Sequence, residues 1–174
     1  MRLLPALAAL ALAGAARAEV VDSQPNGFEV TQKADIAAPA ARVWQALSQV
    51  GAWWNSKHTF SQDAHNLSLE LKPGGCFCET LPGGGGVRHM IVVWLQPGQA
   101  VRFSGVLGPL QSTGAAGHLT WTLKEAAGHT LLTQTYDVGG YAKGGLGTLA
   151  APVDRVLGEQ LGRLKAYVET GKPE

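Results

Sequence analysis

The sequence predicts an α+β fold in which an antiparallel sheet of about six to seven strands packs against one long C-terminal helix. Two observations predict it: a series of short alternating segments joined by tight turns, and a final stretch with apolar residues at helical spacing. Consecutive hairpins imply antiparallel pairing, and the apolar stripe of the helix has to be buried against the sheet. Because the sequence has no internal repeat and no long linker, residues 19–174 are expected to form a single domain.

The first elements after residue 19 are a strand and a short helix. Residues 28–36 alternate apolar and polar side chains, which is typical of a strand with one buried face. Residues 39–50 carry apolar side chains at helical spacing, with Pro39 suited to the first turn and Gly51 to the end. Residues 51–65 mix Trp, Phe and His with polar residues and are expected to form an irregular loop.

The rest of the chain reads as hairpins followed by a helix. Further strands are expected at residues 67–71, 75–81, 87–95, 101–107, 119–123 and 130–138. The segment 139–147 holds five glycines and is expected to be mobile because ordering glycine costs much entropy. Residues 148–170 place Val, Leu and Gln side chains on one stripe and predict a long amphipathic helix that starts near Pro152.

Residues 1–18 have the three parts of a secretory signal. Arg2 supplies the positive start, an apolar stretch follows, and Ala16-Arg17-Ala18 fits a small-x-small cleavage site. The stretch is too short for a convincing membrane span, and no later segment is apolar enough for a stable span after cleavage. We therefore expect an exported protein that starts at Glu19, with the Ala-rich signal favouring a bacterial periplasm.

The composition excludes several classes of protein. Hydrophobic residues make up 45% of the chain and charged residues 16%, which is incompatible with intrinsic disorder. The formal net charge is +1 and there is no basic block, so nucleic acid is not an expected partner. Residues 83–86 are four glycines without a following Lys-Ser or Lys-Thr, so they predict a loop and not a phosphate-binding cradle.

The two cysteines form a Cys-x-Cys pair at Cys76 and Cys78. In an extended strand their Cα atoms would be roughly 6.6 Å apart, at the outer limit for a disulfide, so a bond requires a local bend. Gly74-Gly75 is a candidate source of that bend. Two free buried thiols, a strained disulfide, and a redox or metal-binding pair all remain open. No metal or other cofactor is predicted, since Cys-x-Cys with His89 does not match a standard zinc spacing.

The strand at 28–36, the run from Ala38 to Leu47 and the pair Trp53-Trp54 resemble the opening of the SRPBCC (START-like, helix-grip) superfamily. The closest branch is the one named for the activator of the heat-shock ATPase, with members labelled polyketide cyclase-like. This resemblance implies a curved sheet that grips the last helix around an internal cavity. Members carry lipids or hormones, perform cyclase or hydrolase chemistry, or stimulate a chaperone, so the resemblance implies no single function.

A cavity of this kind would need apolar walls with a few polar groups to orient a ligand. Aromatic residues provide both, and two histidines add candidate hydrogen bonds. The expected ligand-binding residues are Trp54, His58, His89, Trp121, Tyr136 and Tyr141. We also expect Tyr141, at the centre of the glycine-rich segment, to belong to a lid over the cavity mouth.

Acid–base chemistry would need a histidine beside a carboxylate. The candidates are His58 or His89, paired with Asp63 or Glu79. The leading interpretation is an exported domain that binds a small apolar or aromatic molecule. The alternatives are a cyclase, hydrolase or isomerase that uses the same cavity, and a ligand-free partner-binding or stress-related module with a filled core. The sequence does not determine the oligomeric state.

Overall fold

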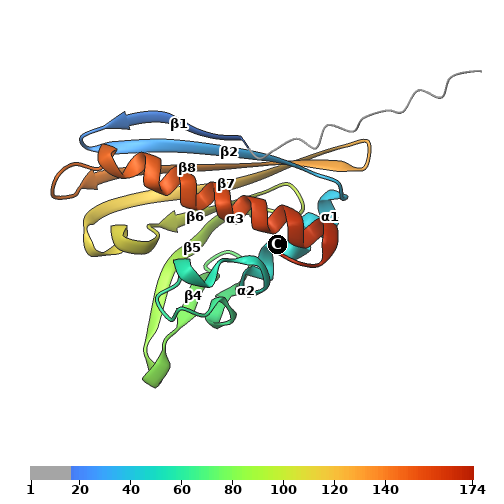
Figure 1. The fold of residues 1–174 in the computed structure, drawn as a ribbon, viewed down its shortest axis with the longest axis horizontal. Helices are drawn as coiled ribbons and strands as arrows, with labels where there is room; N and C mark the ends of the chain where they lie inside the picture. The colour runs from blue at the N-terminus through green and yellow to red at the C-terminus, as the bar shows by residue number, and fades with distance from the viewer. Residues whose placement is uncertain (1–16) are drawn as a thin grey trace, which may run out of the picture.

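Residues 17–174 are described by a computed structural model of the protein (Figure 1). They form one antiparallel sheet of eight strands in the order β1-β2-β8-β7-β6-β5-β4-β3. The strands are β1 (Arg17–Gln24), β2 (Gly27–Ile36), β3 (Leu67–Leu69), β4 (Cys76–Thr80), β5 (Gly86–Gln96), β6 (Ala100–Gly105), β7 (Gly114–Ala126) and β8 (His129–Tyr141). The α+β prediction is confirmed, with one strand more than the sequence indicated.

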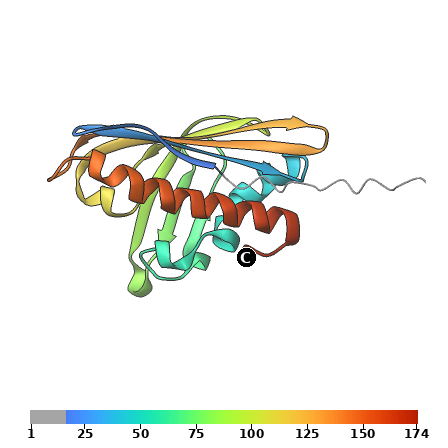
Figure 2. The same ribbon diagram turned by 45° about the horizontal axis from the view of Figure 1, so that its top comes forward.

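Helices occupy one side of this sheet. The α-helices are α1 (Ala40–Ser48), α2 (Val50–Trp53) and α3 (Ala150–Thr170). Short 3-10 turns are η1 (Ser56–His58), η2 (Ala64–Asn66), η3 (Pro82–Gly84), η4 (Gly108–Ser112) and η5 (Gly147–Leu149). The red helix α3 runs across one face of the sheet, with α1 and α2 near its C-terminal end (Figures 1 and 2). None of the helices within residues 17–174 is both long and apolar enough to cross a bilayer.

The apolar stripe of α3 divides into two parts. Leu161, Leu164 and Val168 are fully buried against the core. Val153 and Val156, two turns earlier, are only half-buried, although they lie on the same stripe. The C-terminal half of the helix therefore packs closely, whereas the N-terminal half leaves apolar surface facing open space.

A chain of buried amide groups fixes α3 to the sheet. The Trp121 indole N–H donates to Gln134 Oε1 at 2.7 Å, and Gln134 Nε2 donates to Gln32 Oε1 at 2.9 Å. Gln134 Nε2 also lies 3.3 Å from the Leu157 carbonyl, and Gln32 Nε2 donates to Asp154 Oδ1 at 2.6 Å. Both glutamines are almost completely buried, so they need these partners, and the contacts set the register of α3 on β2 and β8.

A β-bulge in β5 changes which side chains face inward. Phe77 lies opposite Met90 and Cys78 opposite Arg88, so His89 is the extra residue on β5. As a result His89 and Met90 are consecutive and both buried, which breaks the usual alternation along a strand.

Cys76 and Cys78 form a disulfide, with Cα atoms 5.4 Å apart. They are half-buried, on the face of β4 opposite Phe77 and Glu79. The alternative of two free buried thiols is therefore wrong, as is that of a zinc site built on two thiolates. A turn with Gly74 at a φ of 75° directly precedes β4, and a further irregularity lies in the pairing of β4 with β5.

The structure changes two expectations about the strands: it adds β1, and it extends β8 into the glycine-rich segment. β1 pairs with β2 through a tight turn, but it carries the exposed residues Val20 and Val21 and lacks the alternation that would have revealed it. The expected mobile segment 139–147 begins as the end of β8, which pairs with β7 as far as Tyr141. Gly140 is required there because a Cβ at that position would lie 2.4 Å from the Gly114 carbonyl oxygen.

The expected signal segment lies outside the described residues, except for Arg17 and Ala18, which begin β1. The extent of the single domain at residues 19–174 stays a prediction.

Candidate functional site

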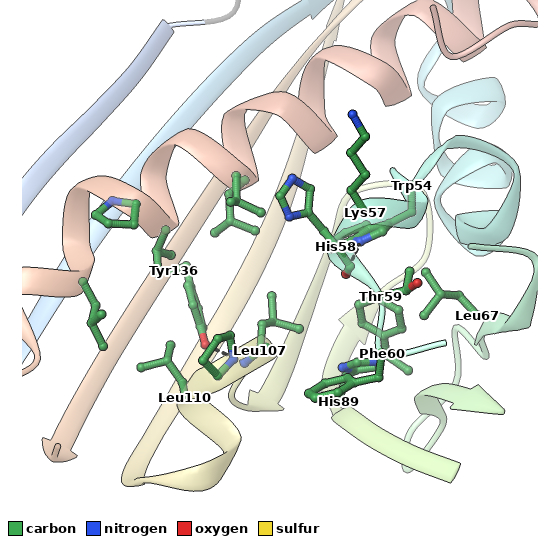
Figure 3. A pocket seen from close by; sticks show the side chains of 18 residues that line it. Trp54, Lys57, His58, Thr59, Phe60, Leu67, His89, Leu107, Leu110 and Tyr136 are labelled. Carbon is green, nitrogen blue, oxygen red and sulfur yellow. Dashed lines mark hydrogen bonds between the residues drawn. The ribbon is translucent and has the colours of Figure 1, made fainter. Parts of the chain in front are cut away.

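A cavity of about 610 Å³ lies between the N-terminal half of α3 and the sheet. Its walls come from four places: residues 54–60, residues 107–110, residues 149–157 and inward side chains of the sheet (Figure 3). The inward side chains from β3, β4, β5 and β8 are Leu67, Phe77, His89 and Tyr136. Most of this surface is aliphatic or aromatic.

The cavity opens to solvent at one side. Lys57, His58 and Phe60 on the segment after α2 are exposed, as are Pro109 on η4 and Pro152 on α3. These five residues form the rim. Residues from three separate parts of the chain therefore meet at the entrance, although neither η1 nor η4 has regular periodicity in the sequence.

The segment that carries the rim is fastened to α3. The Asn55 backbone N–H donates to Gln160 Oε1 at 2.8 Å, and the Asn55 side chain donates to Glu159. Arg163 Nε donates to the Trp53 carbonyl at 2.9 Å. The polar positions of α3 thus hold one edge of the cavity in place, while its apolar positions form a wall.

Four of the six predicted ligand-binding residues line the cavity: Trp54, His58, His89 and Tyr136. Trp121 does not, because β7 directs it into the core, where its indole ring packs on Phe103 and Trp53. Tyr141 does not line the cavity either. Its side chain is 72% exposed at the end of β8, so the structure shows no lid formed by this residue.

The strongest polar feature of the cavity is a buried pair, His89 and Glu79. His89 Nε2 lies 3.0 Å from Glu79 Oε2, and their side chains are 6% and 0% exposed. The Glu79 carboxylate also accepts the backbone N–H groups of Phe60 and Ser61. His89 Nδ1 has a longer contact of 3.4 Å to Gln111 Nε2. Only His89 of the pair lines the cavity, and Glu79 stands behind it.

Burial and hydrogen bonding shift the pKa values of both Glu79 and His89. Burial alone would raise the pKa of Glu79, but hydrogen bonds from Ser61, Phe60 and His89 bring its pKa below the usual 4.5. Burial lowers the pKa of His89 below 6.5, although the nearby carboxylate opposes this. The favoured state is an ionised Glu79 that accepts the Nε2 proton of a neutral His89, with Nδ1 as the basic nitrogen.

Phe60 covers this pair from the solvent side. Its ring is stacked on His89 with centroids 6.0 Å apart, and Phe77 lies on His89 with centroids 5.1 Å apart. The Phe60 backbone N–H donates a hydrogen bond to Glu79. The same carboxylate therefore orients the His89 imidazole and holds the aromatic residue that shields it. Phe60 is 52% exposed, so the shield lies at the rim.

The other candidate acid–base residues lie elsewhere. His58 Nε2 is 3.1 Å from Glu159 on α3, at the exposed rim. Asp63 pairs with His65 at 2.9 Å on the surface and accepts the His65 backbone N–H at the start of η2. Asp63 is therefore not part of the cavity, and the local hydrogen bonds of an exposed turn explain its position.

Sequence reasoning missed the wall contributed by residues 107–110 and the partner of His58. Leu107 is the last residue of the strand expected at 101–107, although β6 ends at Gly105. Residues 108–110 lie in what reads as a Gly- and Pro-rich connection, with no pattern that reveals an inward face. Glu159 lies 101 residues from His58, so only the packing of α3 brings them together. Within residues 17–174 no three metal-ligating side chains come close enough to hold a metal ion.

Comparison with known proteins gives one family. Residues 27–169 match the family described as polyketide cyclase/dehydrase and lipid transport. This match spans β2 to α3 and includes every residue that lines the cavity. A search of curated protein sequences finds no match.

Solved structures share the fold at low sequence identity. CalU16 from Micromonospora echinospora is 16% identical, with a TM-score of 0.59, and the match covers 91% of this chain and 85% of that one. Aha1 from Colwellia psychrerythraea, solved as a dimer, is 19% identical with a TM-score of 0.58 over 83% and 98%. DynU16, from the dynemicin biosynthetic locus, is 25% identical with a TM-score of 0.57 over 83% of this chain and 48% of that one.

We expect Glu79→Gln to lower the free energy of unfolding at pH 7 by about 2–4 kcal/mol, because it replaces a buried carboxylate that accepts three hydrogen bonds. Urea denaturation measures the loss. The contribution of the ionised carboxylate is complete above pH 4.5 and disappears as the pH falls through the lower pKa of the folded protein. The difference between wild type and variant should therefore shrink below pH 4.5.

Glu70→Gln is the matched control for this experiment. Glu70 is 57% exposed and pairs with Lys72 at 3.1 Å, so its substitution should change stability by less than about 1 kcal/mol. Equal effects of the two substitutions would contradict the role assigned to Glu79.

Proposed function

This chain belongs to the polyketide cyclase/dehydrase and lipid transport family, and we propose that it binds a small apolar or aromatic molecule in the cavity between the sheet and α3. The observation that carries the proposal is the cavity itself. Its volume of about 610 Å³ lies within the range of about 300–1,000 Å³ that is usual for small-molecule sites. A ligand-free module with a filled core is not supported, because side chains do not fill this space.

The chemistry of the walls supports the same class of ligand. Trp54 and Phe77 supply large aromatic surfaces, and the aliphatic stripe of α3, which includes Leu157, covers the opposite side. Removing apolar surface from water contributes roughly 25 cal/mol per Å², so a ligand that fills these walls gains most of its affinity from burial. The polar groups His89 and Tyr136 would then fix its orientation.

A bulky side chain placed in the cavity should weaken ligand binding strongly without damaging the fold. Val153 is half-buried on the cavity side of α3, so Val153→Trp would place an indole ring in the proposed ligand space. We expect the affinity for the neutral fluorescent probe N-phenyl-1-naphthylamine to fall at least about tenfold, while the melting temperature stays within a few degrees. Fluorescence titration measures the affinity.

Val21→Trp is the control for that variant, since Val21 is 53% exposed on β1 and outside the cavity. It should bind the probe like the wild type. If the two variants bind the probe equally well, the ligand space is not where we place it.

The second candidate function is acid–base catalysis, and the His89–Glu79 pair favours it. With the Nε2 proton of a neutral His89 held by Glu79, Nδ1 is the basic nitrogen, and it acts as a general base once a bound molecule displaces its 3.4 Å contact with Gln111 Nε2. The lowered pKa of His89 keeps this nitrogen unprotonated at neutral pH. The pair would then remove a proton from a bound molecule at a carbon next to a carbonyl group and return it, as an isomerase or cyclase requires.

Deuterium exchange tests this second candidate directly. With 1-tetralone in deuterium oxide, the protein should accelerate exchange at the carbon beside the carbonyl, and His89→Gln should remove about 10²-fold or more of that acceleration. Mass spectrometry of the ketone measures the exchange. If 1-tetralone binds but exchanges no faster than in buffer alone, the catalytic function is wrong and only the binding function stands.

We further propose that the protein is exported and matures at Glu19. The Cys76–Cys78 disulfide supports an oxidising compartment, because such bonds are rare in the reducing cytosol. Cleavage after Ala18 would keep the pairing of Glu19 with Thr31 and of the rest of β1 with β2.

Expression of the full chain in a Gram-negative bacterium tests export. We expect the protein in the periplasmic fraction with Glu19 as its N-terminal residue by mass spectrometry, and Ala18→Phe should block the cleavage. Recovery of the full-length chain in the cytosol would rule out the signal assignment.

A further inference from the structure

The hydroxyl of Tyr136, a residue of the cavity wall, accepts one hydrogen bond but donates none to the described chain. The Leu107 backbone N–H donates to it at 3.1 Å, and no residue of the described chain accepts its own proton. Tyr136 lies at the end of the cavity near Leu107 and Leu110 (Figure 3). Tyr136 is buried and lines the cavity, so an acceptor for this proton has to come from the cavity side. A buried donor without an acceptor is costly, so a partner from within the cavity would be stabilising.

Tyr136 can act in this position only as a neutral donor. Burial raises the pKa of its hydroxyl far above neutral pH, so the proton stays in place. The backbone N–H of Leu107, two residues beyond the end of β6, occupies one lone pair of the oxygen and orients the ring. The group is thus held in place before a ligand arrives, which reduces the entropic cost of binding.

The interior provides no charge that could neutralise an ionic ligand. The Glu79 carboxylate already accepts three hydrogen bonds, and His89 is neutral. The charged residues near the cavity, Lys57 and Glu159, lie at the exposed rim. Burying an unpaired charge beside Tyr136 would cost several kcal/mol.

We propose that the ligand of this cavity is an uncharged molecule with a carbonyl or ether oxygen, and that this oxygen accepts the proton of Tyr136. This inference rests on the proposed function and narrows it from apolar molecules in general to neutral hydrogen-bond acceptors. Tyr136 would then select among molecules of similar shape, while the apolar walls supply most of the affinity.

A set of ligands with one ring system tests the inference: tetralin, 1-tetralone and 1,2,3,4-tetrahydro-1-naphthoate. By calorimetry, the wild-type protein should bind 1-tetralone about three- to tenfold more tightly than tetralin, which is the effect of one hydrogen bond. The anionic naphthoate should bind more weakly than either. Tyr136→Phe should reduce the affinity for 1-tetralone to that for tetralin and leave tetralin binding unchanged.

The control is Tyr167→Phe. Tyr167 lies on α3 outside the cavity, and its hydroxyl donates to Gln49 Oε1 at 3.0 Å. This variant should keep the preference for 1-tetralone, and unchanged tetralin binding shows that each variant is folded. If tetralin binds but the ketone has no advantage, or if Tyr136→Phe keeps that advantage, the inference is wrong and the proposed function stands. Tighter binding of the naphthoate would likewise overturn the inference, whereas failure of all three ligands to bind would overturn the proposed function as well.

Discussion

The spacing between α3 and the sheet depends on the buried amides of Gln134 and Gln32. Gln134 links Trp121 on β7, Gln32 on β2 and the Leu157 carbonyl on α3 through one side chain. Since each of these groups is buried, moving the helix would leave several of them unpaired, at a cost of about 1–3 kcal/mol each. The helix therefore cannot collapse onto the sheet to fill the open space beside Val153 and Val156, and the cavity persists without a ligand.

A second constraint, the Glu79 carboxylate, organises the opposite wall. It holds His89, which a β-bulge turns inward, and it holds the backbone of Phe60 and Ser61 at the entrance. One buried charge thus connects β4, β5 and the rim segment. This arrangement explains how an irregular segment between α2 and β3 keeps a defined shape, since its anchors are polar contacts to α3 and to the sheet.

The helix-grip framework tolerates wide sequence variation, as the 16–25% identities to CalU16, Aha1 and DynU16 show. A fold shared at these identities does not by itself assign a function. The groups that face the cavity decide which molecules this chain can bind. An apolar interior with one oriented imidazole and one buried phenol hydroxyl favours recognition of a neutral molecule, and the proposed acid–base role depends on the same imidazole.

The sequence alone determined the class of fold, because alternation and helical periodicity depend on local spacing: Phe28–Ile36 and the stripe of α3 are recognisable without any knowledge of their partners. It also indicated Trp54, His58, His89 and Tyr136 as cavity residues, and Glu79 as a partner for His89. Four outcomes became visible only in the folded chain: Trp121 is core, Tyr141 points to solvent, Glu159 rather than Asp63 meets His58, and the two cysteines form a disulfide. Each of these outcomes depends on strand register, on a bulge or on the position of α3, and these are set by contacts between residues far apart in the chain.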